Sequence, residues 1–100
     1  MKDIIVVCEA GITTSLMVKK LNELVEENQK DFSIRSKSTE ESQNYVKGEQ
    51  VDAVLLGPQV HHKIDEYRNA TNAQVLTISV QDYNNMDVYS IFNQLTKALS

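Results

Sequence analysis

Cysteine, proline and glycine are scarce in this sequence: its 100 residues include one cysteine, one proline and three glycines, and there is no tryptophan. A single thiol cannot close a disulfide within the chain, and it lacks the paired spacing of a zinc site or a dithiol redox motif. Any chemistry at Cys8 must therefore use a lone thiol. The sequence also contains no linker, internal repeat or low-complexity segment. We expect one domain over residues 1–100.

Long hydrophobic runs are absent as well. The longest apolar stretches are residues 4–8 and 53–56, far short of the roughly 20 residues that cross a bilayer. The amino terminus has neither a signal-type hydrophobic region nor a small-residue cleavage site. These absences lead us to expect a cytoplasmic protein with no direct membrane insertion.

Positive side chains are fewer than negative ones: the sequence has ten Lys and Arg residues and 14 Asp and Glu residues, which give a formal net charge of -4 at pH 7. The cations are scattered, and a chain of this charge repels polyanions. We therefore expect no nucleic acid ligand. The hydrophobic share of 41% and the charged share of 24% are close to globular averages, which excludes disordered and fibrous classes.

Segments of strand length alternate with segments of helical periodicity along the whole chain. Strands are expected at residues 4–7, 32–34, 51–56 and 75–80. Helices are expected from about residue 13 to 28, from 58 to 67 and from 88 to 99, because their apolar residues recur at helical intervals. A shorter helix is expected from 38 to 48 on its end signals. Ser38 and Glu41 match a capping box, Gly48 suits a helix end, and Pro58 suits a first helical turn.

Residues 4–7 are β-branched without polar alternation, which is typical of a central strand covered on both faces. Residues 32 and 34 alternate with polar neighbours and indicate a more exposed strand. Parallel strands joined by helices need right-handed crossovers. The sequence therefore predicts an α/β fold: an open four-stranded parallel sheet with helices on both faces.

Cys8 lies at the carboxyl end of the first strand, where open parallel sheets bind ligands. The segment from Cys8 to Ser15 then leads into a helix whose first backbone N–H groups have no intrahelical partner, and these donors with the helix dipole attract anions. The segment reads Cys8, Glu9, Ala10, Gly11, Ile12, Thr13, Thr14, Ser15. Its small residues let the backbone curl around a ligand, and its three hydroxyls add donors. The pattern predicts a phosphate-binding loop in which Cys8 is a thiolate nucleophile that forms phosphocysteine.

A cysteine at a strand end is often only a small buried apolar side chain. The glycine and the hydroxyl cluster beside Cys8, at the end of the sheet that binds ligands, favour the functional interpretation over this one. The local pattern alone is only moderately specific.

Two motifs resemble one family. Residues 8–16 are similar to the active loop of IIB components of the bacterial phosphoenolpyruvate-dependent sugar phosphotransferase system, in the lactose, cellobiose and chitobiose class. Residues 55–60, which read Leu-Leu-Gly-Pro-Gln-Val, are the second match. The resemblance extends over nearly the whole chain in length and element order.

This resemblance implies that Cys8 accepts phosphate from the phosphohistidine of a IIA protein and passes it to a sugar held by the membrane permease IIC. It implies a topology similar to that of low-molecular-weight cysteine phosphatases, and a place at the inner face of the membrane through IIC. Lactose, cellobiose and chitobiose-like sugars all fit. We expect neither a cofactor nor a metal.

Two other interpretations stay open. A cysteine phosphatase needs an arginine six positions after its cysteine, and Thr14 occupies that position, so no guanidinium fork holds the transferring group. A stand-alone regulatory phosphocarrier would keep the fold without serving a transporter.

Several polar residues are expected at the rim of this loop. Gln59 follows a strand next to the first one, and it either donates a hydrogen bond near the loop or begins a helix. His61 and His62 project about 100° apart on a helix, which favours a solvated or partner-facing role over a metal site. Tyr83, with Asp82 and Asp87, is interpreted as a contact surface rather than as an acid or base.

Overall fold

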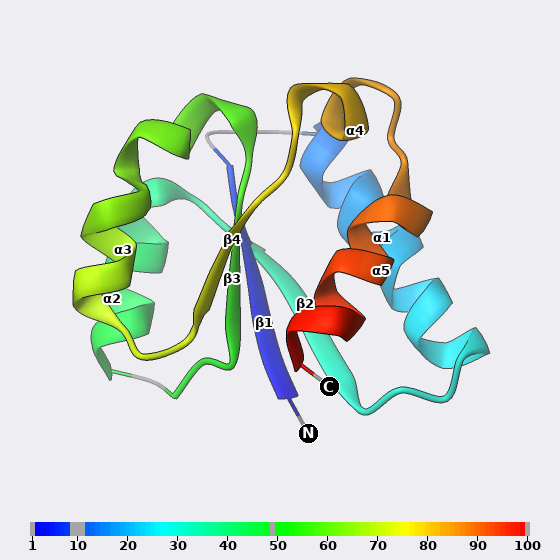
Figure 1. Ribbon diagram of the computed structural model, residues 1–100, viewed down its shortest axis with the longest axis horizontal. Helices are drawn as coiled ribbons and strands as arrows, with labels where there is room; N and C mark the ends of the chain where they lie inside the picture. The colour runs from blue at the N-terminus through cyan, green and yellow to red at the C-terminus, as the bar shows by residue number, and fades with distance from the viewer. Residues whose placement is uncertain (1, 9–11, 49, 100) are drawn as a thin grey trace.

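The computed structural model describes residues 2–8, 12–48 and 50–99, and its sheet matches the predicted architecture. Four parallel strands lie in the order β2-β1-β3-β4 (Figure 1). Their bounds are Lys2–Val7 for β1, Phe32–Lys37 for β2, Ala53–Leu56 for β3 and Gln74–Thr77 for β4. The prediction of an open four-stranded parallel sheet is confirmed.

Strand β1 is central because its apolar residues can be covered on both faces. Ile4 pairs with Ile34 of β2 and Ala53 of β3, and the register continues to Val7. Ile4 to Val7 have no exposed surface at all. Complete burial of one such side chain contributes about 1.5–3 kcal/mol, so the β-branched run alone fixes this strand in the middle of the sheet.

Helices cover both faces of the sheet. On one face α1 (Ile12–Glu27) and α5 (Val88–Leu99) pack over Ile4 and Val6, and on the other α2 (Thr39–Gly48) and α3 (Ile64–Ala70) pack over Ile5 and Val7 (Figure 1). Successive β1 side chains point to opposite faces. The strand therefore contributes to two separate hydrophobic cores.

The capping box predicted for α2 is present. The Ser38 hydroxyl accepts from the Glu41 N–H at 3.2 Å, and Glu41 Oε1 accepts from the Ser38 N–H at 3.2 Å. The bond from the Ser38 backbone N–H first, and then hydrogen bonding by the Ser38 side chain, hold the pKa of the Glu41 carboxyl below its usual value. Two backbone donors that begin α2 are thus satisfied by side chains.

Several strand bounds differ from the prediction. Strand β1 begins two residues earlier, at Lys2, and β2 runs on to Lys37. Strand β3 begins at Ala53 because Asp52 bonds differently: its N–H donates to Asp3 O at 2.8 Å and its carboxylate accepts from the Asp3 N–H at 2.7 Å. Strand β4 ends at Thr77. Val80 was expected in that strand, but it is exposed and begins a short helix, α4 (Val80–Asn84), which the periodicity did not predict.

The segment expected as one helix over residues 58–67 is divided in two. A 3-10 helix, η1, runs over Pro58–Lys63, with Pro58 in its first turn as predicted, and α3 follows it. Val60 has φ -124° and ψ 17°, which are not helical values. Its buried side chain joins the core beneath α3, so packing overrides the helical geometry at this residue. No helix within the described ranges is long and apolar enough to cross a membrane.

Candidate active site

The carboxyl ends of three strands meet beside Cys8. The Cys8 N–H donates to Lys37 O of β2 at 3.3 Å, and the Gly57 N–H, after β3, donates to Val7 O at 2.9 Å. After β1 the chain forms β2 on one side of β1, and it then forms β3 on the other side of β1. Cys8 therefore lies at the change in strand order, where open α/β sheets bind ligands.

The Cys8 sulfur has polar partners from distant parts of the chain. Its Sγ lies 3.3 Å from the Tyr83 hydroxyl and 3.6 Å from Gln59 Oε1. The Tyr83 hydroxyl also lies 3.4 Å from Thr14 Oγ1. Cys8 and Thr14 are only 4% and 3% exposed, whereas Tyr83 is half-buried and Gln59 is exposed, so these contacts join a buried thiol to the surface at the end of the sheet. A buried thiol with hydrogen-bonding partners is more than a small apolar core residue.

The predicted phosphate loop is described only in part. Glu9, Ala10 and Gly11 lie outside the described residues, and of Ile12 and Thr13 the structure describes the helical backbone alone. Helix α1 begins at Ile12. Within the described part, Thr14 faces inward beside Tyr83 and Ser15 is exposed.

The rim residues divide into two groups. Gln59 and Tyr83 contact the sulfur itself, so Tyr83 lies closer to the thiol than a rim position implies. His61 instead donates from Nε2 to Ile78 O at 2.7 Å and ties η1 to the end of β4, while His62 is exposed. The structure thus separates two histidines that are adjacent in sequence.

The two carboxylates near Tyr83 interact with the beginning of α5. Asp82 Oδ2 accepts from the Ser90 hydroxyl at 2.8 Å, and Asp87 Oδ1 accepts from the Ser90 N–H at 3.1 Å. The Asp82 bond joins α4 to α5 and so helps to position Tyr83, whereas the Asp87 bond is local to the first turn of α5. The direct Tyr83 contact with Cys8 was missed because it joins residues 75 apart, and no local pattern records such a pairing.

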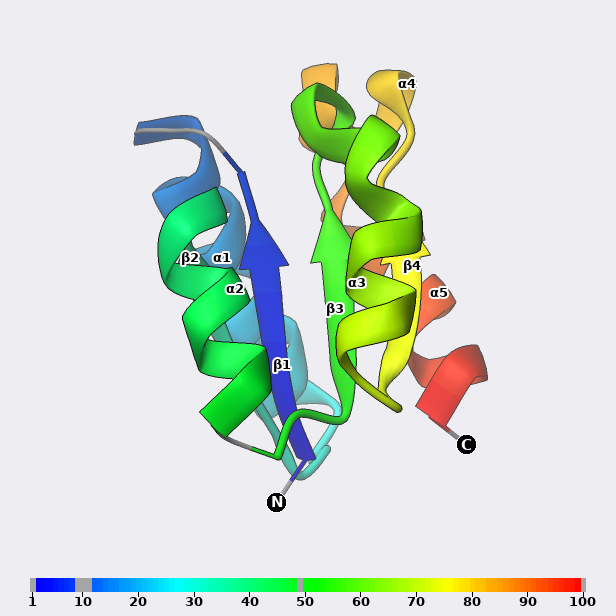
Figure 2. The same ribbon diagram turned by 90° about the vertical axis from the view of Figure 1, so that its left-hand side faces the viewer.

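A hollow of about 610 Å³ lies at the opposite end of the sheet. Its lining includes Gln50, Asn69, Thr71 and Asn72, around the amino ends of β3 and β4. Figure 2 shows α4 at the end of the sheet to which the strand arrows point, whereas the residues that line the hollow lie at the other end of the strands. Because parallel sheets place their chemistry at the carboxyl ends of strands, the Cys8 group is the candidate active site.

Comparison of sequences connects this geometry to one family. Residues 3–94 match the family model described as "PTS system, Lactose/Cellobiose specific IIB subunit". The chain is 38% identical over 93 residues to the PTS system galactose-specific EIIB component of Lactococcus lactis subsp. cremoris, strain MG1363, covering 85% of this chain and 84% of that protein. It is 37% identical, with the same coverage, to the cellobiose-specific EIIB component of Lactococcus lactis subsp. lactis, strain IL1403.

Two solved structures have the same fold. The lactose-specific IIB component domain from Streptococcus pneumoniae has a TM-score of 0.83 at 13% identity, covering 99% of this chain and 98% of that one. The solution structure of the cellobiose-specific phosphotransferase IIB component from Borrelia burgdorferi has a TM-score of 0.75 at 22% identity, covering 98% and 91%. At these identities the likeness establishes the fold.

Proposed function

The chain belongs to the lactose/cellobiose-specific IIB subunits of the sugar phosphotransferase system, and from this membership we propose that Cys8 is the residue that carries the phosphoryl group. The family assigns a phosphotransferase role in sugar transport. The observation that carries the proposal is the position of the chain's only cysteine, at the carboxyl end of β1 with Tyr83 and Gln59 against its sulfur. No second thiol competes for the role.

The proposed reaction has two transfers. The Cys8 sulfur is the nucleophile in the first and the leaving group in the second. In the first, an S–P bond forms as the N–P bond of phosphohistidine on IIA breaks. The thiol loses its proton, and the released imidazole nitrogen gains one. In the second, a sugar hydroxyl oxygen attacks phosphorus, the S–P bond breaks and the hydroxyl proton restores the thiol.

The described groups around Cys8 suit this chemistry. A thiolate or a phosphoryl group needs hydrogen-bond donors, and the Tyr83 hydroxyl lies at the sulfur with Thr14 beside it. The first turn of α1 also begins nearby, and its backbone N–H groups favour an anion. We further propose that Glu9 to Ser15 form the phosphate-binding loop, with His61 at the surface that meets partner proteins.

The proposed partners are a IIA protein as phosphate donor and the membrane permease IIC as the holder of the sugar. In this arrangement the protein works in the cytoplasm, at the inner face of the membrane. The two Lactococcus relatives are named for galactose and for cellobiose. A β-linked disaccharide or galactoside of this class is the sugar we propose, with IIC making the choice.

The test is phosphorylation by a phosphorylated IIA protein, followed by intact-mass measurement and peptide mapping. One phosphoryl group on Cys8 is the expected result, and Cys8→Ala should take up none. His61→Ala and His62→Ala should both remain phosphorylated. Phosphate mapped to either histidine, or undiminished uptake by Cys8→Ala, would refute the assignment. Adding IIC-containing membranes and sugar then separates a transport component, which loses its phosphate to sugar, from a stand-alone regulatory carrier.

A further inference from the structure

The hydrogen bonds around the Cys8 sulfur have one consistent direction, because the thiol and each hydroxyl carry a single proton. Gln59 Oε1 can only accept, so the thiol donates to it across 3.6 Å. The sulfur has no second proton, so the Tyr83 hydroxyl donates to Sγ. That donation uses the Tyr83 proton, so the Thr14 hydroxyl donates to the Tyr83 oxygen. The chain of donors runs from Thr14 through Tyr83 and Cys8 to Gln59.

We infer that Gln59 adapts to the chemical state of Cys8 by presenting its carboxamide oxygen to the thiol and its carboxamide nitrogen to the thiolate or to the phosphoryl group that the sulfur carries. Once the thiol proton has left, Oε1 and a negative sulfur are two acceptors that face each other. Rotation of the carboxamide about its last torsion replaces Oε1 by the donor Nε2. Tyr83 donates in every state, so it holds the sulfur while Gln59 responds to it.

The surroundings of Gln59 allow this rotation. Its backbone is fixed, since the Val60 N–H donates to Gly57 O at 3.0 Å and His61 is bonded to the end of β4. Its side chain is exposed, so the carboxamide can turn without moving the core. A fixed backbone under a free carboxamide is the arrangement that an adapting partner requires.

The elements near the sulfur carry other titratable groups, which must be held constant in a test. Tyr83 of α4 contacts the sulfur, and Asp82 on the same helix is bonded to a serine of α5. The His61 ring of η1 is engaged by a backbone carbonyl, and the Lys37 ammonium of β2 lies 5.0 Å from the centre of a tyrosine ring. Glu9 follows in sequence, outside the described residues. Substitutions at Gln59 leave all of these side chains unchanged.

The first test uses the S–H stretching band in the Raman spectrum, which reports on Cys8 alone because the chain has one cysteine. Gln59→Met keeps the length of the side chain and removes the acceptor, so the band should move to higher wavenumber. Gln59→Glu offers a stronger acceptor and should move it to lower wavenumber. Gln81→Met, at an exposed position of α4, is the control and should leave the band in place. An unmoved band in Gln59→Met would overturn the inference.

The second test measures the rate of Cys8 alkylation by iodoacetamide against pH. Gln59→Glu cannot donate to a thiolate, so its alkylation at pH 7 should be about tenfold slower, a shift of about one pH unit in the profile. Gln81→Glu adds the same charge on exposed α4 and should slow alkylation less than about twofold, since solvent screens it. Equal slowing in these two variants would mean that charge alone acts, and would refute the inference.

Two further variants separate an adapting partner from a simple donor. Gln59→Met loses both the acceptor for the thiol and the donor for the thiolate. Because the two losses oppose one another, its rate of alkylation should stay within about threefold of the rate of the unmodified protein. Tyr83→Phe loses only a donor and should be slower by about tenfold. If Gln59→Met were as slow as Tyr83→Phe, Gln59 would be a donor alone.

Only the phosphorylated state in this inference rests on the proposed function. Both measurements use the unphosphorylated protein and need no IIA. A protein that fails to take up phosphate but shows the expected band and profiles would refute the proposed function and leave the thiol and thiolate roles of Gln59 standing. A protein that takes up phosphate but shows neither the expected band nor the expected profiles would refute only these roles of Gln59.

Discussion

Gly57 supplies space beside the sulfur rather than an unusual backbone conformation. Its φ of -65° and ψ of 164° are open to any residue. A Cβ at this position would lie 3.2 Å from Gln59 Oε1, 3.3 Å from Val7 O and 3.6 Å from Cys8 Sγ. The Val7 carbonyl is held by the Gly57 N–H at 2.9 Å, so the Gln59 side chain is the group that would have to move.

Gly57→Ala should therefore impair the site more than the fold. We expect phosphoryl transfer from IIA to be slower by about tenfold, in line with small misplacements of catalytic groups, and the free energy of unfolding to fall by about 1 kcal/mol. Transfer kinetics and urea unfolding of the same preparation measure the two effects. Wild-type transfer in a protein of normal stability would show that the space beside the sulfur is not needed.

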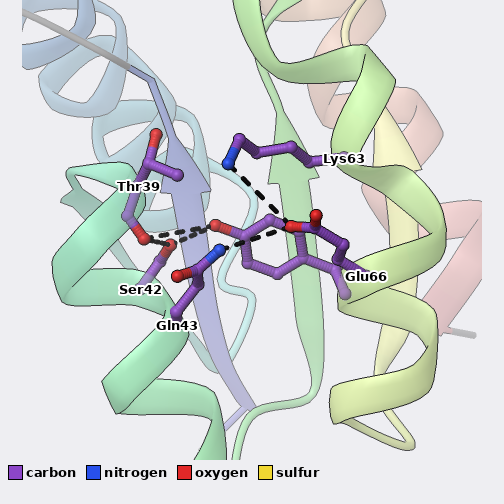
Figure 3. Close-up of polar contacts among 6 residues, drawn as sticks. Thr39, Ser42, Gln43, Lys63 and Glu66 are labelled. Atoms are coloured by element: carbon purple, nitrogen blue, oxygen red, sulfur yellow. Dashed lines mark hydrogen bonds and ion pairs between the residues drawn. The ribbon is translucent and has the colours of Figure 1, made fainter.

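At the scale of elements, a buried polar contact joins α2 to α3. The Ser42 hydroxyl donates to Thr39 O at 2.9 Å, so the Tyr67 hydroxyl donates to Ser42 Oγ, with Thr39 O 3.5 Å away. Ser42 and Tyr67 are 0% and 1% exposed. Figure 3 shows Thr39 and Ser42 on α2 facing the residues of α3. This contact replaces apolar packing at the place where the two helices meet.

An outer layer of polar side chains covers this contact. Gln43 Nε2 lies 3.4 Å from Glu66 Oε2, and Lys63 Nζ lies 3.9 Å from the same oxygen (Figure 3). Exposed ion pairs of this length contribute 0–1 kcal/mol. The buried Tyr67 hydroxyl therefore contributes most of the polar stabilisation between the two helices.

Tyr67→Phe should lower the free energy of unfolding by about 1 kcal/mol, the usual contribution of one hydrogen bond. It should also reduce the loss of stability in alkali. Burial raises the pKa of the Tyr67 hydroxyl, so the folded protein keeps a proton that the unfolded chain loses. The stability that the bound proton contributes is fully present below about pH 10, the ordinary pKa of a tyrosine in an unfolded chain. It is lost as pH rises through the pKa of Tyr67 in the folded protein.

Urea unfolding of both proteins at a series of pH values between 8 and about 11.5 measures this effect. Tyr89→Phe is the matched control, because Tyr89 is 70% exposed on α5 and should leave both quantities unchanged. An alkaline loss of stability as large in Tyr67→Phe as in the unmodified protein would assign that loss to other groups.

Helix α4 shows why a short element depends on tertiary contacts. A helix of five residues has no stability by itself. The Ser79 hydroxyl accepts from the Asp82 N–H at 3.0 Å, and Asp82 is in turn bonded to Ser90. These bonds, together with the Tyr83 hydroxyl at the sulfur, hold in place an element that carries part of the candidate active site.

At the scale of the whole molecule, a carrier must keep its phosphoryl group while it exchanges one partner for another. Position 14, where a cysteine phosphatase has its arginine, is a buried threonine bonded to Tyr83. With no guanidinium there to stabilise the attack of water, we expect phosphocysteine to outlast the time of partner exchange when no sugar acceptor is present. Release of inorganic phosphate from the isolated phosphoprotein measures its lifetime.

A second measurement addresses the phosphatase alternative directly. The unphosphorylated protein should turn over p-nitrophenyl phosphate no faster than Cys8→Ala does. Turnover that exceeds this background and disappears with the cysteine would favour a phosphatase over a carrier.

The sequence by itself determined the parts of this protein that local patterns encode. The apolar run in β1, the helical periodicity of α1 and α5, and the Ser38 and Glu41 capping box all specify structure within a few residues, and the structure confirms them. The motifs around Cys8 and Gly57 identified the family, which the comparisons confirm.

Only the tertiary structure decided which side chains meet at the sulfur. Tyr83 and Gln59 lie 75 and 51 residues from Cys8 in sequence, and the order of the strands brings them together. The end of β4, the break at Val60 and the bond from His61 to Ile78 were also set by packing. Periodicity and capping record interactions between residues within about a turn of one another, whereas these contacts exist only once the sheet has assembled.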